Sequence, residues 1–154
     1  MPTVEKLLLG SQATLLTTEL NTLANNGTAI STVLGGTGVY DNTIGQAGDG
    51  YTLCDVELVV TYGVAPTANT GVSFWFLLAE DGANYEDGDA STTPGRLPDI
   101  VFPLRAVTTA QRITRRAMMP WGKWKSLAKN DGTGQAMAAS GNTIKIRPVT
   151  PEGV

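Results

Sequence analysis

Asp55 and Glu57 are the two acidic residues whose spacing comes closest to that of a catalytic pair. Two positions apart on an extended chain, their side chains project from one face about 7 Å apart, a separation that overlaps the one glycosidases use. Any solvent-facing strand carries such pairs, so the spacing favours a hydrated face or an interface over catalysis. A glycoside hydrolase is the enzyme alternative, and we assign no catalytic residue.

Histidine is absent from the 154 residues, and cysteine occurs once, as Cys54. These counts exclude Ser-His-Asp and Cys-His catalysis, histidine-ligated metals and disulfides within the chain. Cys54 lies in an apparent strand and has no histidine to activate it, which favours a small buried thiol over a nucleophile. We therefore expect no enzyme activity and no cofactor.

An acidic loop at residues 81–89 is rich in aspartate, asparagine and glycine. These side chains supply the oxygen ligands that a hard cation such as calcium requires, although their spacing is not that of an EF-hand. The same residue types make turns, because Asx side chains bond to the nearby backbone. The turn interpretation is favoured, and no metal site is assigned.

Basic and aromatic residues interleave in the second half of the chain, as nucleic-acid binding requires. Strand alternation would spread them over both faces of a sheet, and arginine and tryptophan are equally typical of protein interfaces. A protein contact is favoured. The set comprises Arg105, Arg112, Arg115, Arg116, Lys123, Lys125 and Lys129, with Trp121 and Trp124.

Charge is unevenly distributed along the chain, although the net charge is only -3. Residues 1–95 contain eleven acids and one base, whereas residues 96–154 contain ten bases and three acids. Such halves can pair within the domain, leave complementary faces for a neighbouring copy or partner, or simply scatter both signs over a hydrated surface. The net charge argues against nucleic acid as a partner, and no stretch approaches the roughly 20 apolar residues that cross a membrane.

Short segments rich in β-branched and aromatic residues, separated by 18 glycines and 8 prolines, predict an all-β protein. Alternation is clearest over residues 53–62, and residues 72–79 are apolar on both faces; an antiparallel pair of these two is expected. One short helix is predicted at residues 18–25, and Pro148 is expected to end the last strand.

About seven or eight strands of this kind close most economically as a β-sandwich of jelly-roll type, with a partly open barrel as the alternative. We expect an N-terminal arm at residues 1–17 and one sandwich domain at residues 18–154. A long polar loop at residues 80–98 is typical of a functional or interface element.

Several segments in combination resemble small structural proteins of tailed bacteriophages. They lie at residues 19–24, 40–42, 57–58, 81–91, 102–106, 111–112 and 129–143. The resemblance covers most of the chain from residue 18 to residue 147. It implies a jelly-roll component of the virion, a cement or decoration protein on the capsid surface, assembled in the host cytoplasm.

The partners implied are the major capsid protein and further copies of the chain, as a homotrimer, with neither nucleic acid nor membrane. A tail, baseplate or head-fibre component is one alternative. A carbohydrate-binding module that stacks sugars on Trp75, Trp121, Trp124 and Tyr85 is another. Residues expected to contact a partner are Leu7, Leu8, Leu9, Tyr85, Asp87, Asp89, Arg96, Arg115 and Arg116.

Overall fold

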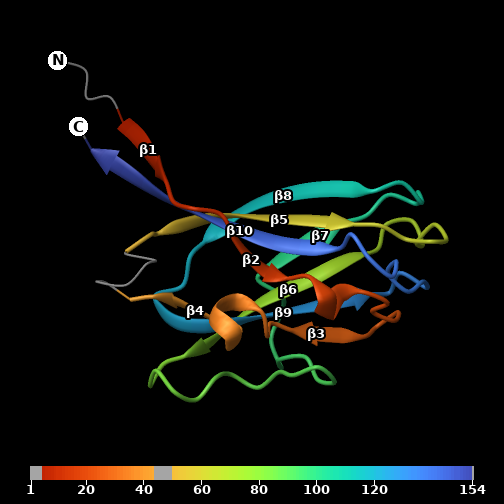
Figure 1. The fold of residues 1–154 in the computed structure, drawn as a ribbon, viewed down its shortest axis with the longest axis horizontal. Helices are drawn as coiled ribbons and strands as arrows, with labels where there is room; N and C mark the ends of the chain where they lie inside the picture. The colour runs from red at the N-terminus through yellow and green to blue at the C-terminus, as the bar shows by residue number, and fades with distance from the viewer. Residues whose placement is uncertain (1–4, 44–49, 154) are drawn as a thin grey trace.

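A computed structural model describes residues 5–43 and 50–153, and this part of the chain folds into ten strands in two antiparallel sheets (Figure 1). In the first sheet, which we call sheet A, β10 lies beside β5, and β8 forms the far edge. The strands of sheet A are β1 (Glu5–Leu9), β2 (Ala13–Leu16), β5 (Leu53–Val60), β8 (Gln111–Met118) and β10 (Thr143–Gly153).

The second sheet, sheet B, is centred on β9 and β6. Its strands are β3 (Thr28–Ile30), β4 (Val39–Asn42), β6 (Gly71–Ala79), β7 (Ile100–Pro103) and β9 (Gly122–Asp131). Because β1 and β2 share one edge position beside β10, and β3 and β4 share one beside β9, each sheet has four strand positions. Their order, with the chain crossing repeatedly between the sheets, is that of a jelly roll, which confirms the predicted fold class.

The core lies between the sheets and follows from strand alternation. In β5 every second residue is buried, so Val56, Leu58 and Val60 face inward while Asp55 and Glu57 face outward. From sheet B, Trp124 is fully buried, stacks on Tyr40 at 4.8 Å and meets Phe76 edge-on at 4.9 Å. All three side chains come from sheet B, on β4, β9 and β6, so these aromatic contacts tie the strands of that sheet together on its core side.

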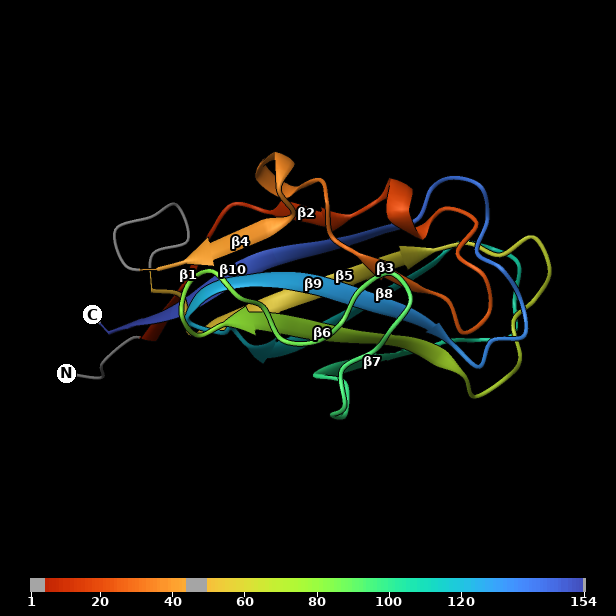
Figure 2. The same cartoon turned by 90° about the horizontal axis from the view of Figure 1, so that it is seen from below.

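Strand β6 is buried on both faces, as its sequence predicts, because the loop at residues 80–98 lies across the outer face of sheet B (Figure 2). Trp75, Leu77 and Leu127 form a second apolar cluster on that face, with Ile30 packed against it. The loop therefore has a structural inner side, whatever its outer side contacts.

Two predictions, one about strand pairing and one about a helix, are wrong. β5 and β6 do not pair with each other, since β5 lies between β10 and β8 and β6 between β9 and β7. The two runs are consecutive in sequence, but they face each other across the core. The predicted helix at residues 18–25 is reduced to a single 3-10 turn, η1 (Thr18–Leu20).

Local bonding explains the shortened helix. Thr22 adopts a left-handed backbone conformation (φ 57°), and its N–H donates to Ala138 O at 3.1 Å. The Asn130 side-chain amide donates to the carbonyls of Leu23 and Ala24. Tertiary partners thus take the groups that a helix would have used, and a helix of this length has too little stability of its own to compete.

The last strand continues through Pro148 and Pro151, contrary to the prediction that proline would stop it. Pro148 lies opposite Cys54, and its carbonyl accepts the Gly10 N–H at 2.8 Å. A proline lacks only the donor, so a strand passes through it where the carbonyl alone is needed.

The predicted arm at residues 1–17 contains β1 and β2, both paired with β10. Leu15 and Leu16 are buried in the core, so β2 belongs to the sandwich. Residues 1–4 lie outside the described residues.

Candidate functional site

The first feature of the candidate site is a two-stranded ribbon that leaves the sandwich at one end (Figures 1 and 2). β1 pairs with β10 from Glu5 opposite Gly153 to Leu9 opposite Val149, whereas β5 begins at Leu53, also opposite Val149. Residues 150–153 of β10 therefore have only β1 beside them among the described residues. We call residues 5–9 and 149–153 the terminal ribbon.

Three leucines make the terminal ribbon apolar on both sides. Leu7, Leu8 and Leu9 are 54%, 48% and 53% exposed. Successive strand residues point to opposite faces, so Leu8 lies on one face and Leu7 and Leu9 on the other. A two-stranded ribbon is only marginally stable alone in water, and exposed apolar patches mark contact sites. The ribbon thus has the properties of a surface that another chain completes.

Two further apolar side chains lie at the same end, on the opposite edge of sheet A. Leu53 pairs with both Val149 and Met118, so Leu9, Val149, Leu53 and Met118 form one row across the sheet. Met118 is 80% exposed, and Trp121, in the turn to β9, is 54% exposed.

These two residues stand at the rim of a hollow of about 400 Å³ between the edges of the two sheets, which we call the notch. The notch exists because β7 pairs with β6 only from Gly71 to Phe74, leaving the second half of β6 without a neighbouring strand on that side among the described residues. It is lined by Phe76, Leu78, Asp99, Ala117, Met118, Met119, Pro120 and Trp121.

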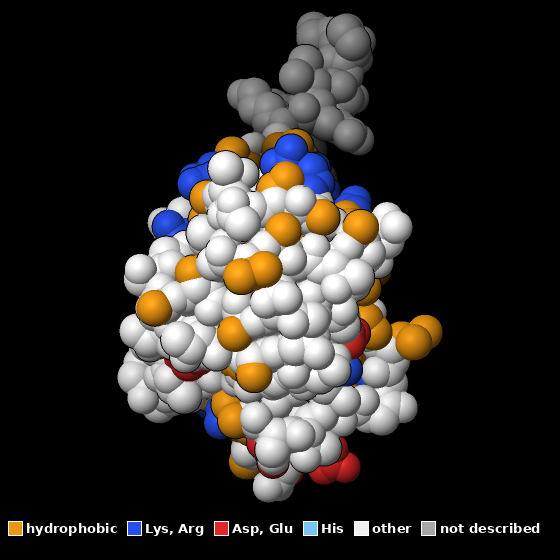
Figure 3. Space-filling model, turned by 90° about the vertical axis from the view of Figure 1, so that its right-hand side faces the viewer, with side chains coloured by type: hydrophobic (Ala, Val, Ile, Leu, Met, Phe, Trp, Pro, Cys, Tyr) orange, Lys and Arg blue, Asp and Glu red, His pale blue; other side chains and the backbone are white. Residues whose placement is uncertain are grey.

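The opposite end of the sandwich differs in character (Figure 3). There the loops present mostly uncharged polar atoms, and the apolar side chains are scattered rather than gathered. In this view most Lys and Arg side chains lie along the upper margin, over sheet A. We therefore take the end that carries the terminal ribbon and the notch as the candidate contact surface and call it the apolar end.

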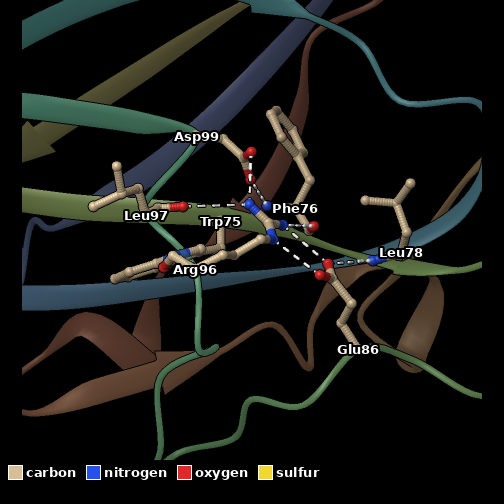
Figure 4. A network of polar contacts seen from close by, with 7 residues as sticks. All are labelled: Trp75, Phe76, Leu78, Glu86, Arg96, Leu97 and Asp99. Carbon is tan, nitrogen blue, oxygen red and sulfur yellow. Dashed lines mark hydrogen bonds and ion pairs between the residues drawn. The ribbon is translucent and has the colours of Figure 1, made fainter.

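Groups of the long loop, together with Asp99 directly after it, replace the missing strand beside β6 (Figure 4). The Phe76 N–H donates to Asp99 Oδ2 at 2.8 Å, and Arg96 Nη2 donates to the Phe76 carbonyl at 2.8 Å. Further along, the Glu86 N–H donates to the Leu78 carbonyl at 2.9 Å, and the Leu78 N–H donates to Glu86 Oε2 at 3.4 Å. We call Glu86, Arg96 and Asp99 the clasp. The clasp covers an open sheet edge, to which a strand of another chain could otherwise pair.

Arg96 is the centre of the clasp. Its guanidinium bonds both oxygens of Glu86 at 2.9 Å and Asp99 Oδ1 at 2.8 Å. The hydrogen bond to Arg96 holds the pKa of Glu86 below its usual value, and the bond to Glu86 raises the pKa of Arg96. Arg96, expected from the sequence to contact a partner, is thus engaged within its own chain.

Acidic residues of the loop mostly make turns. Asp81 accepts the N–H groups of Asn84 at 2.7 Å and Ala83 at 2.9 Å, and these bonds lower its pKa to about 2. Asp89 accepts the N–H groups of Ser91 and Thr92 in the same way. Within the part of the chain that the structure describes, no three potential metal-ligating side chains gather, and the geometry agrees with the turn interpretation.

The remaining loop residues expected to contact a partner lie on the surface. Asp87 is exposed. Tyr85 is half-buried, with the Lys125 ammonium 4.7 Å from the centre of its ring, and burial raises its pKa. Tyr85 therefore already carries a cation on its ring from sheet B.

The outer face of sheet A carries paired charges rather than a catalytic pair. Asp55 accepts two bonds from Arg116, at 2.7 and 2.9 Å, and Glu57 accepts one from Arg112 at 2.8 Å. The bond from Arg116 lowers the pKa of Asp55, whereas a glycosidase acid needs a raised one. Arg115 is exposed and lies opposite Val56 on the β8 edge.

The basic and aromatic residues do not form one patch. Arg112, Arg115 and Arg116 lie on sheet A, whereas Lys123, Lys125 and Lys129 lie on β9 of sheet B. Trp124 is fully buried in the core, and Trp75 is 4% exposed beneath the loop, where its Nε1–H donates to the Arg96 carbonyl. Neither indole can stack on a base or a sugar.

Two nucleophile candidates are also embedded in the sheets. Cys54 is buried, and burial raises the pKa of its thiol to about 12. Ser126 and Lys129 have the Ser-x-x-Lys spacing of some acyltransferases, and the interpretation of the sequence as lacking this motif is wrong. On β9 they point to opposite faces; Ser126 is fully buried, and Lys129 pairs with Asp131 at 2.8 Å.

Sequence reasoning missed Met118 as a contact candidate, and it missed Glu86 and Asp99 as partners of Arg96. It named Trp121 only within the basic and aromatic set for which a protein contact was favoured. The turn signal at residues 119–122 placed Trp121 outside a strand, which was the available hint of its exposure. Within the described chain there is no helix with the length and apolar character of a membrane span. Comparison with protein-family models, curated proteins and solved structures finds no match to this chain.

Proposed function

We propose that this chain is a non-enzymatic structural protein of a tailed-bacteriophage virion, a cement protein that sits on the capsid surface and bridges neighbouring capsid subunits. The observation that carries the structural role is the apolar end. Leu7, Leu8 and Leu9 are about half exposed on a ribbon that reaches beyond the sandwich. The assignment to a capsid rests on the sequence resemblance stated above.

Two other observations support a role in contact rather than catalysis. The carboxylates nearest to a catalytic spacing, Asp55 and Glu57, are neutralised by Arg116 and Arg112. The indoles of Trp75 and Trp124 are covered, which leaves Trp121 as the one exposed tryptophan among the described residues. A cement protein works through buried area and through many copies acting together, and an extended apolar ribbon supplies such area in each copy.

The test mixes the purified full-length protein with capsids that lack it and measures retention of the protein on the capsids after sedimentation. The wild type is expected to bind saturably, and a Leu7→Ser, Leu8→Ser, Leu9→Ser variant to lose most of its occupancy. A Val64→Ser, Leu97→Ser variant is the matched control, because both residues are exposed apolar side chains outside the apolar end (61% and 87% exposed).

Failure of the wild type to bind capsids would overturn the capsid assignment. Binding to tail tubes or connectors instead would move the protein to the tail, and binding to a glycan array would favour the carbohydrate alternative. Retention by the triple serine variant at the wild-type level would show that capsid binding does not require the ribbon.

A further inference from the structure

We infer that the terminal ribbon of one copy packs against Met118 and Trp121 at the notch of a second copy, so that copies join in a closed ring. This inference deepens the proposed function, on which it rests, by naming what covers the ribbon when copies assemble into the ring that sits on the capsid. The two surfaces are apolar, lie at the same end and occupy opposite edges of sheet A.

Register places the two surfaces at one level. Leu9, Val149, Leu53 and Met118 form a continuous row across the sheet. At the usual strand spacing, three steps put the two edges about 14 Å apart. Rotation about an axis that lies beside the sandwich and runs parallel to the strands keeps this level. It therefore brings the ribbon of one copy alongside its neighbour's Met118 and the turn to Trp121, without a shift along the strands.

Strand direction suits the same arrangement. β1 is antiparallel to β10, β10 to β5, and β5 to β8, so β1 and β8 run in opposite directions. When a neighbour related by simple rotation places its β1 at the β8 edge, the two strands meet antiparallel. Antiparallel neighbours are the arrangement found throughout both sheets.

The exposed area is large enough to matter. With large side chains taken at about 200 Å² each, the exposed fractions of Leu7, Leu8, Leu9, Met118 and Trp121 amount to on the order of 500 Å². A standard interface buries about 1,600 Å² in total, somewhat more than half of it apolar. These five side chains thus supply about half of the apolar share.

A contact between unlike surfaces explains more than a contact between two ribbons. If two ribbons met each other, Met118 and Trp121 would remain exposed at 80% and 54%. In a ring every copy uses both surfaces, so both are covered. Contacts between unlike surfaces close into rings when the rotation is right, and a trimer is the smallest such ring.

Two variants of the full chain test the inference by sedimentation velocity. The first carries Leu7→Ser, Leu8→Ser and Leu9→Ser, which removes the ribbon surface. The second carries Met118→Ser and Trp121→Ser, which removes the notch surface. Circular dichroism and thermal melts confirm that each variant folds, and the Val64→Ser, Leu97→Ser variant is the matched control.

The wild type and the control are expected to be oligomers, and each of the two variants alone a monomer. An equimolar mixture of the variants is expected to form dimers and no larger species, because it holds one intact ribbon and one intact notch surface per pair. A monomeric wild type, an oligomeric notch variant, or a mixture that stays monomeric would each overturn the inference.

Capsid binding of the wild type is measured separately from its oligomeric state. A wild type that binds capsids saturably but is a monomer in solution would leave the proposed function standing and overturn the ring. A wild type that forms a ring in solution but does not bind capsids would leave the ring standing and overturn the capsid assignment.

Discussion

Replacing Arg96 with methionine is expected to release the long loop from the edge of β6. The guanidinium bonds Glu86 through two atoms, Asp99, and the Phe76 carbonyl, all within 2.9 Å. Methionine keeps much of the side-chain volume but makes none of these bonds. The substitution therefore tests whether side chains hold this sheet edge closed.

The expected loss of unfolding free energy follows from how exposed the Arg96 side chain is. Exposed ion pairs contribute at most about 1 kcal/mol, and breaking a buried pair costs about 3–5 kcal/mol. The Arg96 side chain is 33% exposed, so we expect a loss of about 2 kcal/mol, discounted for solvent screening. For a chain of this size the loss corresponds to a decrease in Tm of roughly 4–8 °C.

The pH dependence has a definite sign. Glu86 has a pKa below its ordinary value of 4.5 because of Arg96. A depressed carboxyl pKa contributes stability above the unfolded value, and this contribution is lost as the pH falls through the folded value. The difference in free energy of unfolding between wild type and Arg96→Met is therefore expected to have its whole value at pH 7 and to become smaller below pH 4.5.

Urea unfolding followed by circular dichroism measures the free energy, and limited proteolysis of residues 80–98 reports on the loop. Arg116→Met is the matched control, since Arg116 also forms a two-bond ion pair, with Asp55, but its side chain is 49% exposed. We expect this substitution to lower the free energy of unfolding by less than Arg96→Met does. Equal costs for the two variants, or an Arg96→Met loss under about 0.5 kcal/mol with unchanged proteolysis, would refute the reasoning.

Three further outcomes are expected. Asn130→Ala should cost about 3 kcal/mol in urea unfolding, because its side chain accepts the Tyr62 hydroxyl at 2.8 Å and donates to carbonyls of two loops; a loss under 1 kcal/mol would contradict this. In an NMR titration the Asp81 carboxyl should stay ionised until about pH 2, and titration at its ordinary value of 3.8 would contradict the turn geometry. The Cys54 thiol, with a pKa of about 12, should react with a thiol reagent only as fast as the protein unfolds.

The sequence predicted those elements whose burial depends on alternation alone. Val56, Leu58 and Val60 are inward because every second residue of a half-buried strand must be, and β6 reads as apolar because both of its faces are covered. Which strands pair was not predictable in this way. β5 and β6 follow each other in sequence, yet the jelly roll places them in different sheets.

Local signals failed where distant residues supplied the bonds. The helix expected at residues 18–25 lost its carbonyls to Asn130, more than a hundred residues away. The strand expected to end at Pro148 continued because Gly10 donates to that proline's carbonyl.

The candidate site was predicted in part for the same reason. Leu7, Leu8 and Leu9 stand out in the sequence as an apolar run near charged residues. Met118 and Trp121 gain their meaning only from the register that aligns Met118 with Leu9 across four strands. Arg96 was expected at an interface, and its actual role became visible only with the free edge of β6 beside it.

Hydrogen–deuterium exchange of the full chain, free at low concentration and bound to capsids that lack it, tests most directly whether the apolar end is the contact surface. Slower exchange on binding is expected at residues 5–9 and 118–121, with no change in the loops of the opposite end at residues 61–70 and 104–110. Protection confined to those opposite loops, with the terminal ribbon exchanging as fast as in the free protein, would contradict the account.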